Sequence, residues 1–80
     1  MSSESRFLNR VEKVVRDVES LLMELEALRD DLKHVVAEVR VSRDRERMKT
    51  LESLSADLEK AYETLKSLYR QLTLVRLKYS

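Results

Sequence analysis

The amino-acid sequence predicts an all-α protein folded as an antiparallel hairpin of two helices, and three observations lead to that prediction. Apolar residues recur at alternating three- and four-residue spacings through two long segments, as they do on one face of an α-helix. The chain contains no Gly and no Pro, so no helix breaker interrupts either segment. The phase of the apolar pattern is lost between residues 40 and 50, which leaves two arms of nearly equal length.

The first helix is expected over residues 4–40, after a flexible N-terminus at residues 1–4. Ser3 or Ser5 can cap this helix through its hydroxyl group. A second apolar row beside the main series is interrupted by Arg29, so the apolar stripe is about three positions wide per heptad. That width exceeds the two-position strip of a simple coiled coil and indicates a helix with two neighbours. The main series contains Phe7, Val11, Val14, Val18, Leu21, Leu25, Leu28, Leu32, Val35 and Val39, and the second row contains Leu8, Val15, Leu22 and Val36.

A turn is expected at residues 41–45, because the first series, continued past Val39, meets only polar residues. Ser42 or Asp44 can cap a second helix there. The alternative is an unbroken rod more than ~100 Å long with a phase defect. The missing Gly and Pro favour the rod, whereas the equal arms favour the hairpin. The second helix is expected over residues 46–78, along a series that contains Leu51, Leu54, Leu58, Ala61, Leu65, Leu68, Leu72, Val75 and Tyr79.

A single hairpin with two wide apolar stripes leaves apolar surface uncovered. Residues 1–80 form one small domain, and domains of this size usually need a disulfide, a metal or a partner subunit. The chain has no Cys and a single His, which argues against disulfides and zinc sites. We therefore expect two hairpins to form a dimeric four-helix bundle, a coiled-coil-like assembly. The residues expected at its helix interfaces are Leu21, Leu25, Leu28, Leu32, Leu58, Leu65, Leu68, Leu72, Leu74, Leu77, Tyr62 and Tyr69.

The charged residues make up 39% of the chain but leave a net charge of only +1, which argues against a polycation that coats nucleic acid. Residues 21–39 and residues 50–63 each carry a net charge of −3, and in a hairpin they lie side by side as an acidic belt. The turn, residues 40–49, carries +3, and residues 64–80 carry +4. Cations near helix C-termini account for part of this pattern. The alternative is that the basic ends dock on the acidic belts of neighbouring hairpins or of another protein.

No group of residues suggests catalysis. His34 falls on the solvent side of the first helix without a second titratable group at helical spacing. Carboxylate pairs such as Glu24 and Glu26 point around the outside of the helix, whereas a general acid needs partial burial. Arg29 is the only cation within the apolar rows, too few for the dianion site of a small helical mutase. We expect no enzyme activity, no metal, no cofactor and no small-molecule substrate.

The sequence favours a non-enzymatic assembly module that self-associates through leucine-rich helix faces. One alternative is a subunit or co-chaperone of a larger complex that docks through Leu74, Leu77 and Tyr79. The size and two-helix layout are similar to those of small secretion co-chaperones and other hairpin adaptors, and no residue role is carried over from them. A second alternative is a nucleic-acid-associated factor, although interleaved acids and missing aromatic side chains argue against it. Its phosphate contacts would be Arg40, Arg43, Arg45, Arg47 and Lys49.

The expected location is the cytoplasm. The N-terminal residues lack the apolar core of a signal peptide, and no apolar run approaches the ~20 residues that span a bilayer. The chain has few amide side chains and many charged ones, which is the direction taken by proteins of thermophiles. Helix-rich proteins shift the same way because of helix propensity.

Overall fold

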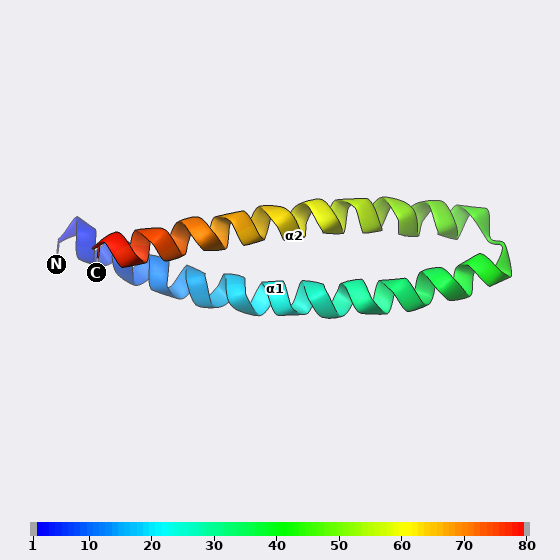
Figure 1. Ribbon diagram of the computed structural model, residues 1–80, viewed down its shortest axis with the longest axis horizontal. Helices are drawn as coiled ribbons and strands as arrows, with labels where there is room; N and C mark the ends of the chain where they lie inside the picture. Colours follow the sequence, from blue (N-terminus) through cyan, green and yellow to red (C-terminus); the bar gives the residue numbers. More distant parts are fainter. Residues whose placement is uncertain (1, 80) are drawn as a thin grey trace.

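The computed structural model describes residues 2–79 and shows two long antiparallel helices joined by a tight turn (Figure 1). Helix α1 spans Ser3–Ser42 and helix α2 spans Arg45–Tyr79. The molecule measures 59 × 17 × 15 Å, and the described ends of the chain lie together, opposite the turn. A continuous helix of this chain would exceed ~100 Å in length. The hairpin prediction is therefore confirmed, and the unbroken rod is wrong.

The N-terminus of α1 is capped by Ser2, whose hydroxyl oxygen accepts a hydrogen bond from the backbone N–H of Ser5 at 3.1 Å. The prediction that Ser3 or Ser5 is the cap was wrong by one residue or more, because Ser3 already has helical backbone geometry. Glu4 lies in the first turn, where the helix dipole favours negative charge. Of the four residues expected to be flexible, residue 1 lies outside the described part, and the other three cap or begin α1.

The turn consists of Arg43 and Asp44. Arg43 has left-handed backbone angles (φ 61°, ψ 28°), and its N–H donates to the carbonyl oxygen of Val39 at 3.1 Å. Asp44 caps α2, because its Oδ1 accepts a hydrogen bond from the N–H of Arg47 at 3.1 Å. This confirms Asp44 as a cap, whereas the Ser42 hydroxyl donates to the Val39 carbonyl instead. Arg43 does here what Gly usually does at a helix end.

The two helices contact each other along a strip that we call the seam. Its side chains are buried or half-buried and repeat at alternating three- and four-residue spacings, as in a coiled coil. In α1 the seam contains Leu8, Val11, Val15, Val18, Leu22, Leu25, Arg29, Leu32, Val36 and Val39. In α2 it contains Met48, Leu51, Ser55, Leu58, Tyr62, Leu65, Tyr69, Leu72 and Arg76.

The seam has a different phase from the main apolar series expected along the sequence. The expected second row of α1, which includes the fully buried Val15, lies in the seam. The expected main series of α1 is divided: alternate members, such as Val11 and Val18, lie in the seam, and the members between them, such as Phe7 and Leu21, lie outside it. Three adjacent apolar rows can be covered only two at a time by one partner helix, so the third remains outside. Each helix was expected to have two neighbouring helices. In the single chain each helix contacts one other helix, so the chain itself supplies one of the two.

Candidate interaction surface

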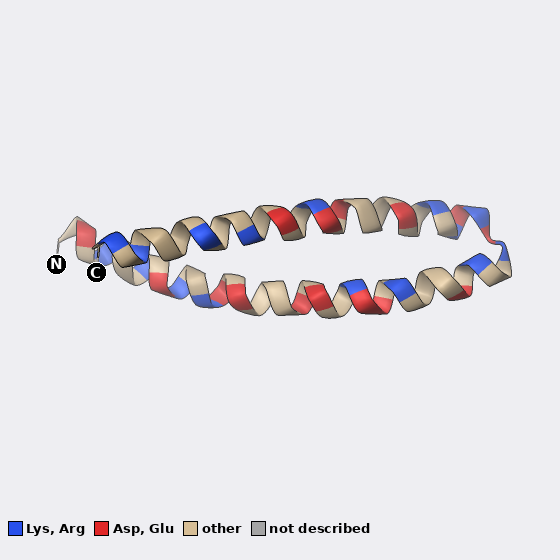
Figure 2. Ribbon diagram, in the orientation of Figure 1, with Lys and Arg blue, Asp and Glu red and all other residues tan. Residues whose placement is uncertain are grey.

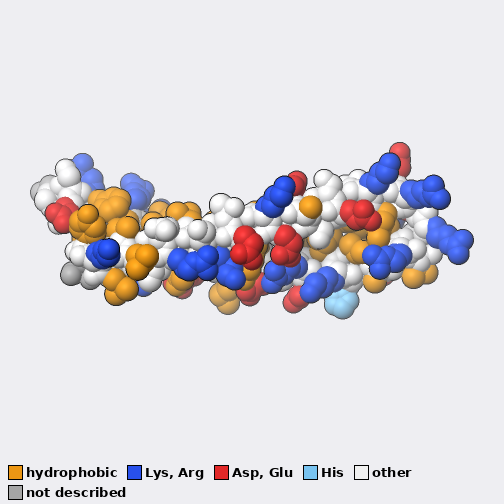
Figure 3. Space-filling view, turned by 45° about the horizontal axis from the view of Figure 1, so that its top comes forward, with side chains coloured by type: hydrophobic (Ala, Val, Ile, Leu, Met, Phe, Trp, Pro, Cys, Tyr) orange, Lys and Arg blue, Asp and Glu red, His pale blue; other side chains and the backbone are white. Residues whose placement is uncertain are grey.

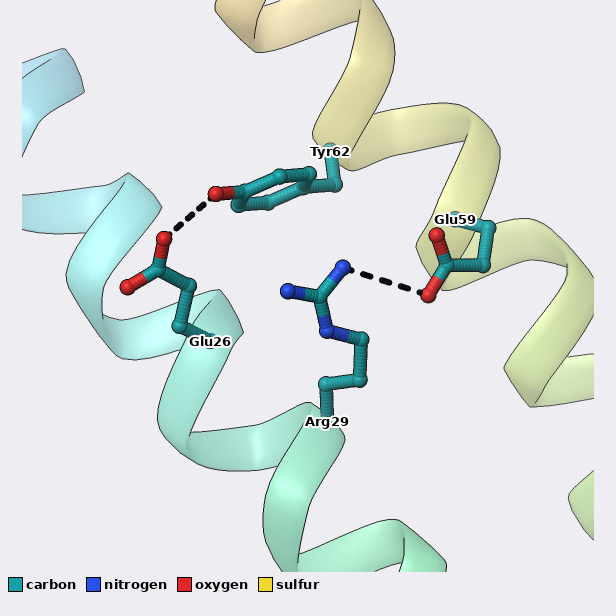
Figure 4. Close-up of polar contacts among 4 residues, drawn as sticks. All are labelled: Glu26, Arg29, Glu59 and Tyr62. Carbon is teal, nitrogen blue, oxygen red and sulfur yellow. Dashed lines mark hydrogen bonds and ion pairs between the residues drawn. The ribbon is translucent and has the colours of Figure 1, made fainter.

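One side of the seam is closed by polar contacts, shown for the middle of the hairpin in Figure 4. The hydroxyl group of Tyr62 on α2 donates a hydrogen bond to the carboxylate of Glu26 on α1. Arg29 lies between them and the next turn of α2, where its Nη1 is 3.4 Å from Oε1 of Glu59. The Arg29 guanidinium also stacks over the Tyr62 ring at 4.6 Å from its centre. The Arg29 side chain that interrupts the apolar row is thus held by α2.

Two further contacts continue the same side toward the chain ends. The hydroxyl group of Tyr69 donates to Oε1 of Glu19 at 3.0 Å, and Nη1 of Arg76 lies 3.6 Å from Oε2 of Glu12. In all four contacts the two residue numbers add to 88, which defines one constant antiparallel register. We call this set the polar ladder; it comprises Glu12–Arg76, Glu19–Tyr69, Glu26–Tyr62 and Arg29–Glu59.

The polar ladder changes the protonation equilibria of its members. The hydrogen bond to Glu26, followed by partial burial, raises the pKa of Tyr62 above its usual value. The hydrogen bond to Glu19 and partial burial raise the pKa of Tyr69 in the same way. Partial burial lowers the pKa of Arg29, but the hydrogen bond and charge of Glu59 outweigh it and the net shift is upward. All three shifts hold the protonated form, so these groups act as hydrogen-bond donors rather than as bases.

The opposite side of the seam is apolar. Carboxylates of both helices, such as Glu26 and Glu59, lie on the side of the polar ladder, so the heptad repeat places the remaining apolar row of each helix on the other side. Leu21 and Leu68 are typical of these rows, with 44% and 43% of their surface exposed. We call this surface the apolar face; it comprises Phe7, Val14, Leu21, Leu28 and Val35 of α1, and Leu54, Ala61, Leu68 and Val75 of α2.

A groove at the turn end connects the two rows of the apolar face. It has a volume of about 320 Å³ and is lined by Val35 of α1 together with Arg47, Thr50 and Leu51 of α2, beside Glu46. Since Val35 and Arg47 occupy equivalent heptad positions in the two helices, this groove shows that the two rows lie on the same side of the hairpin.

The twelve residues predicted at helix interfaces divide among three places. Leu25, Leu32, Leu58, Leu65, Leu72, Tyr62 and Tyr69 lie in the seam of the single chain. Leu21, Leu28 and Leu68 lie on the apolar face, and Leu74 and Leu77 are exposed near the end of α2.

The end of α2 carries large exposed apolar side chains outside both the seam and the apolar face. Leu74, Leu77 and Tyr79 expose 50%, 69% and 55% of their surface. A shallow depression of about 360 Å³, lined by Tyr69, Arg70, Thr73 and Leu74, lies beside them. Figure 3 shows hydrophobic side chains gathered at this end of the molecule, which also carries the start of α1.

The basic residues of the turn all lie on the surface, and Figure 2 shows them around the turn, with acidic residues over the middle of both helices. The acidic residue Asp44 lies among them; it is half-buried, and its carboxylate caps α2 by accepting a hydrogen bond from the Arg47 N–H. The side chains predicted as phosphate contacts, all exposed, are Arg40, Arg43, Arg45, Arg47 and Lys49.

The described residues contain no group of three or more His, Cys, Asp or Glu side chains placed to hold a metal ion. His34 is exposed, as the sequence predicted. Within residues 2–79 the structure has no buried polar or charged side chain, so no cavity holds a desolvated acid or base. None of the helices formed by these residues has the length and apolar character that a membrane crossing requires.

The polar ladder was not predicted, although the sequence carries a signal for it. Glu12, Glu19 and Glu26 are seven residues apart, and so are the residues they contact on α2. Two sets with the same spacing on antiparallel helices can pair along their whole length once the register is known. The register depends on the length of the turn, which only the structure shows.

Together the fold and these surfaces define a helical hairpin with one polar and one apolar side. No protein-family model, no curated protein and no solved structure matches the chain.

Proposed function

We propose that this protein is a non-enzymatic assembly module that associates with other helices through its apolar face, in the first place with copies of itself. The observation that supports this most is the partial exposure of one apolar row on each helix, both on the same side of the hairpin. Contiguous exposed apolar surface of this kind marks interaction sites in soluble proteins. The opposite side is occupied by the polar ladder, which leaves one face for association.

The size of the apolar face fits a helix-bundle interface. The hairpin is 59 Å long and 17 Å wide, which gives one face of about 1,000 Å², near the ~800 Å² that each partner of a standard interface buries. The apolar side chains recur every seven residues, the spacing at which helices of a bundle interdigitate. A second hairpin laid on this face would complete a four-helix bundle.

The experiment is sedimentation equilibrium of the wild type and two variants. Leu21→Lys places a charge at the centre of the apolar face. Met23→Lys is the matched control, because Met23 is 71% exposed, lies outside the apolar face and is two residues away on the same helix. We expect the wild type and Met23→Lys to form the same oligomer and Leu21→Lys to be mostly monomeric. A monomeric wild type at high micromolar concentration would refute self-association.

A second candidate, docking of a different protein, is favoured by the exposed Leu74, Leu77 and Tyr79. This surface lies outside the apolar face, so it would remain uncovered in a four-helix bundle. Under this alternative the isolated wild type aggregates or lacks cooperative unfolding, and Leu74→Lys suppresses the aggregation. If the wild type forms a cooperatively unfolding oligomer and Leu74→Lys changes neither its size nor its unfolding, this alternative is contradicted.

A further inference from the structure

We propose that two copies of this chain pair through the apolar face in antiparallel orientation, about a two-fold axis that crosses α1 at Leu21 and α2 at Leu68. This inference rests on the proposed self-association and adds the orientation and register of the two copies. It follows from two independent features of the described residues: the position of the apolar rows and the charges that border them.

The apolar row of α1 is symmetric about Leu21. Phe7 and Val14 precede it by fourteen and seven residues, and Leu28 and Val35 follow it at the same spacings. A two-fold axis at this level therefore places Phe7 near Val35 of the second copy and Val14 near Leu28 of the second copy. All five apolar positions of α1 gain apolar neighbours in this register, and a shift by one heptad in either direction leaves one of them outside.

The row of α2 fits the same axis. Leu68 and Leu21 lie at nearly the same height along the hairpin, because the paired residues of the polar ladder have numbers that add to 88 and these two add to 89. Val75 and Ala61 lie seven residues on either side of Leu68. The axis thus passes through the centre of the α1 row and, in α2, through Leu68 between Ala61 and Val75, whereas Leu54 has no symmetric counterpart.

Exposed charges border the apolar face at positions that suit this arrangement. Arg10 precedes Leu21 by eleven residues and Asp31 follows it by ten, so Arg10 of one copy lies level with Asp31 of the other to within ~1.5 Å along the axis. In the same way Asp57 precedes Leu68 by eleven residues and Lys78 follows it by ten. Symmetry doubles each pair, which gives four contacts between opposite charges.

One contact between like charges remains in this register. Asp17 and Glu24, which also border the apolar face, lie on either side of Leu21 and approach each other between the copies. It occurs twice in the dimer, against four contacts between opposite charges. The balance of charges at the border of the face therefore favours the antiparallel arrangement.

The parallel arrangement, with the two-fold axis along the hairpin, reverses this balance. It places α1 beside α2 of the second copy at equal height, so Arg10 meets Lys78 and Asp31 meets Asp57. It also places the basic turn of one copy beside that of the other, and the acidic belt, residues 21–39 and 50–63, beside the acidic belt of the other; Figure 2 shows where these charges lie in one hairpin. All these contacts are repulsive, and exposed like charges at such spacing destabilise the association.

The first test is a charge exchange. Arg10→Glu should raise the dissociation constant of the dimer about three- to tenfold, since it replaces two exposed ion pairs by two repulsive contacts. Adding Asp31→Arg should restore the dissociation constant to near the wild-type value. Arg10 and Asp31 are 21 residues apart on one helix, about 32 Å, so a rescue cannot arise within one chain. Arg6→Glu, on the outer surface, is the control and should change little. In the parallel arrangement Arg10→Glu would tighten association instead.

The second test measures distances between spin labels by pulsed electron resonance. The chain has no Cys, so Ser20→Cys or Ser53→Cys introduces one label per copy. Both serines are exposed, and neither lies on the apolar face. In the antiparallel dimer the Ser53 labels should be about 40–50 Å apart, and the Ser20 labels, close to the axis, about 20–25 Å apart. In a parallel dimer both pairs would be about 20–25 Å apart.

The outcomes separate the two proposals. A long Ser53 distance together with rescue by the charge exchange supports the antiparallel dimer. A dimer with a short Ser53 distance, or without rescue, overturns the arrangement but leaves self-association intact. A chain that is monomeric at every concentration overturns the proposed self-association, and this arrangement with it.

Discussion

Replacement of Leu58 by Ala tests the division of apolar residues between the seam and the apolar face. Leu58 is 5% exposed and lies in the seam next to Glu59, which contacts Arg29 of α1. Leu54, one helical turn earlier, is 43% exposed and belongs to the apolar face. The two leucines share the same helix and the same substitution, so Leu54→Ala is a matched control.

The expected magnitudes differ because the two sites lose different amounts of burial. Leu58→Ala removes an almost fully buried side chain and leaves a cavity, which costs about 2–5 kcal/mol. An 80-residue domain has a total stability of about 4–12 kcal/mol, so this loss is a large part of it. Leu54 is little more than half buried in the single hairpin and borders solvent, so its truncation leaves no cavity and should cost about 1 kcal/mol.

The assay is urea unfolding followed by helical circular dichroism, at a low protein concentration at which the hairpin is monomeric and again at a high one. At low concentration we expect Leu58→Ala to be largely unfolded and Leu54→Ala to be close to wild type. At high concentration the wild type should gain stability by mass action, and Leu54→Ala should gain less, because its face is impaired.

Two results would refute this reasoning. Equal destabilisation by both substitutions at low concentration would mean that Leu54 is buried in the single chain. A Leu58→Ala variant as stable as wild type would mean that the seam described here does not hold the hairpin together.

Three further predictions concern the turn, the polar ladder and the basic cluster. Arg43→Gly should stabilise the hairpin by up to about 1 kcal/mol in urea unfolding, because relief of left-handed strain exceeds the added entropy of the unfolded chain; Arg43→Val should destabilise it. The pKa values of Tyr62 and Tyr69 are raised above their ordinary value of 10.0, so their contribution to stability is complete below pH 10 and is lost as the pH rises through the folded-state values. The double variant Tyr62→Phe/Tyr69→Phe should lose less stability than the wild type between pH 9 and pH 11. If the basic turn, residues 40–49, binds phosphate backbones, a mobility-shift titration should show binding that weakens steeply with added salt; no shift at low salt with DNA or RNA would remove that alternative.

Several features of the fold were predictable because they depend on local periodicity. The three- and four-residue spacing of Val11, Val18, Leu25 and their neighbours is a property of one helix and needs no partner to be recognised. The loss of that spacing after Val39 marked the turn to within two residues. The hairpin followed from these observations and from the similar length of the two arms.

The location of the turn was harder to derive from residue type. Arg43 adopts the left-handed backbone conformation, which at the end of a helix is usually occupied by Gly or Asn. An arginine gives no such signal, and the missing helix stop is the reason why a continuous rod remained an alternative. Asp44, in contrast, was predicted as a helix cap, because an Asp carboxylate can accept a hydrogen bond from a free backbone N–H at the start of a helix.

The sequence by itself determined that two helices form and that their apolar stripes are three rows wide, which is wider than one neighbouring helix covers. Only the tertiary structure decided which two rows meet in the seam and which row remains open. The physical reason is that nothing within an isolated helix distinguishes one pair of adjacent apolar rows from another. Which pair is buried depends on the partner helix. Here Arg29 of α1 and Tyr62, Tyr69 and Arg76 of α2 occupy equivalent seam positions in their helices and reach carboxylates of the opposite helix on one side only. Those contacts turn the remaining apolar rows of both helices to the other side, where they form a single face.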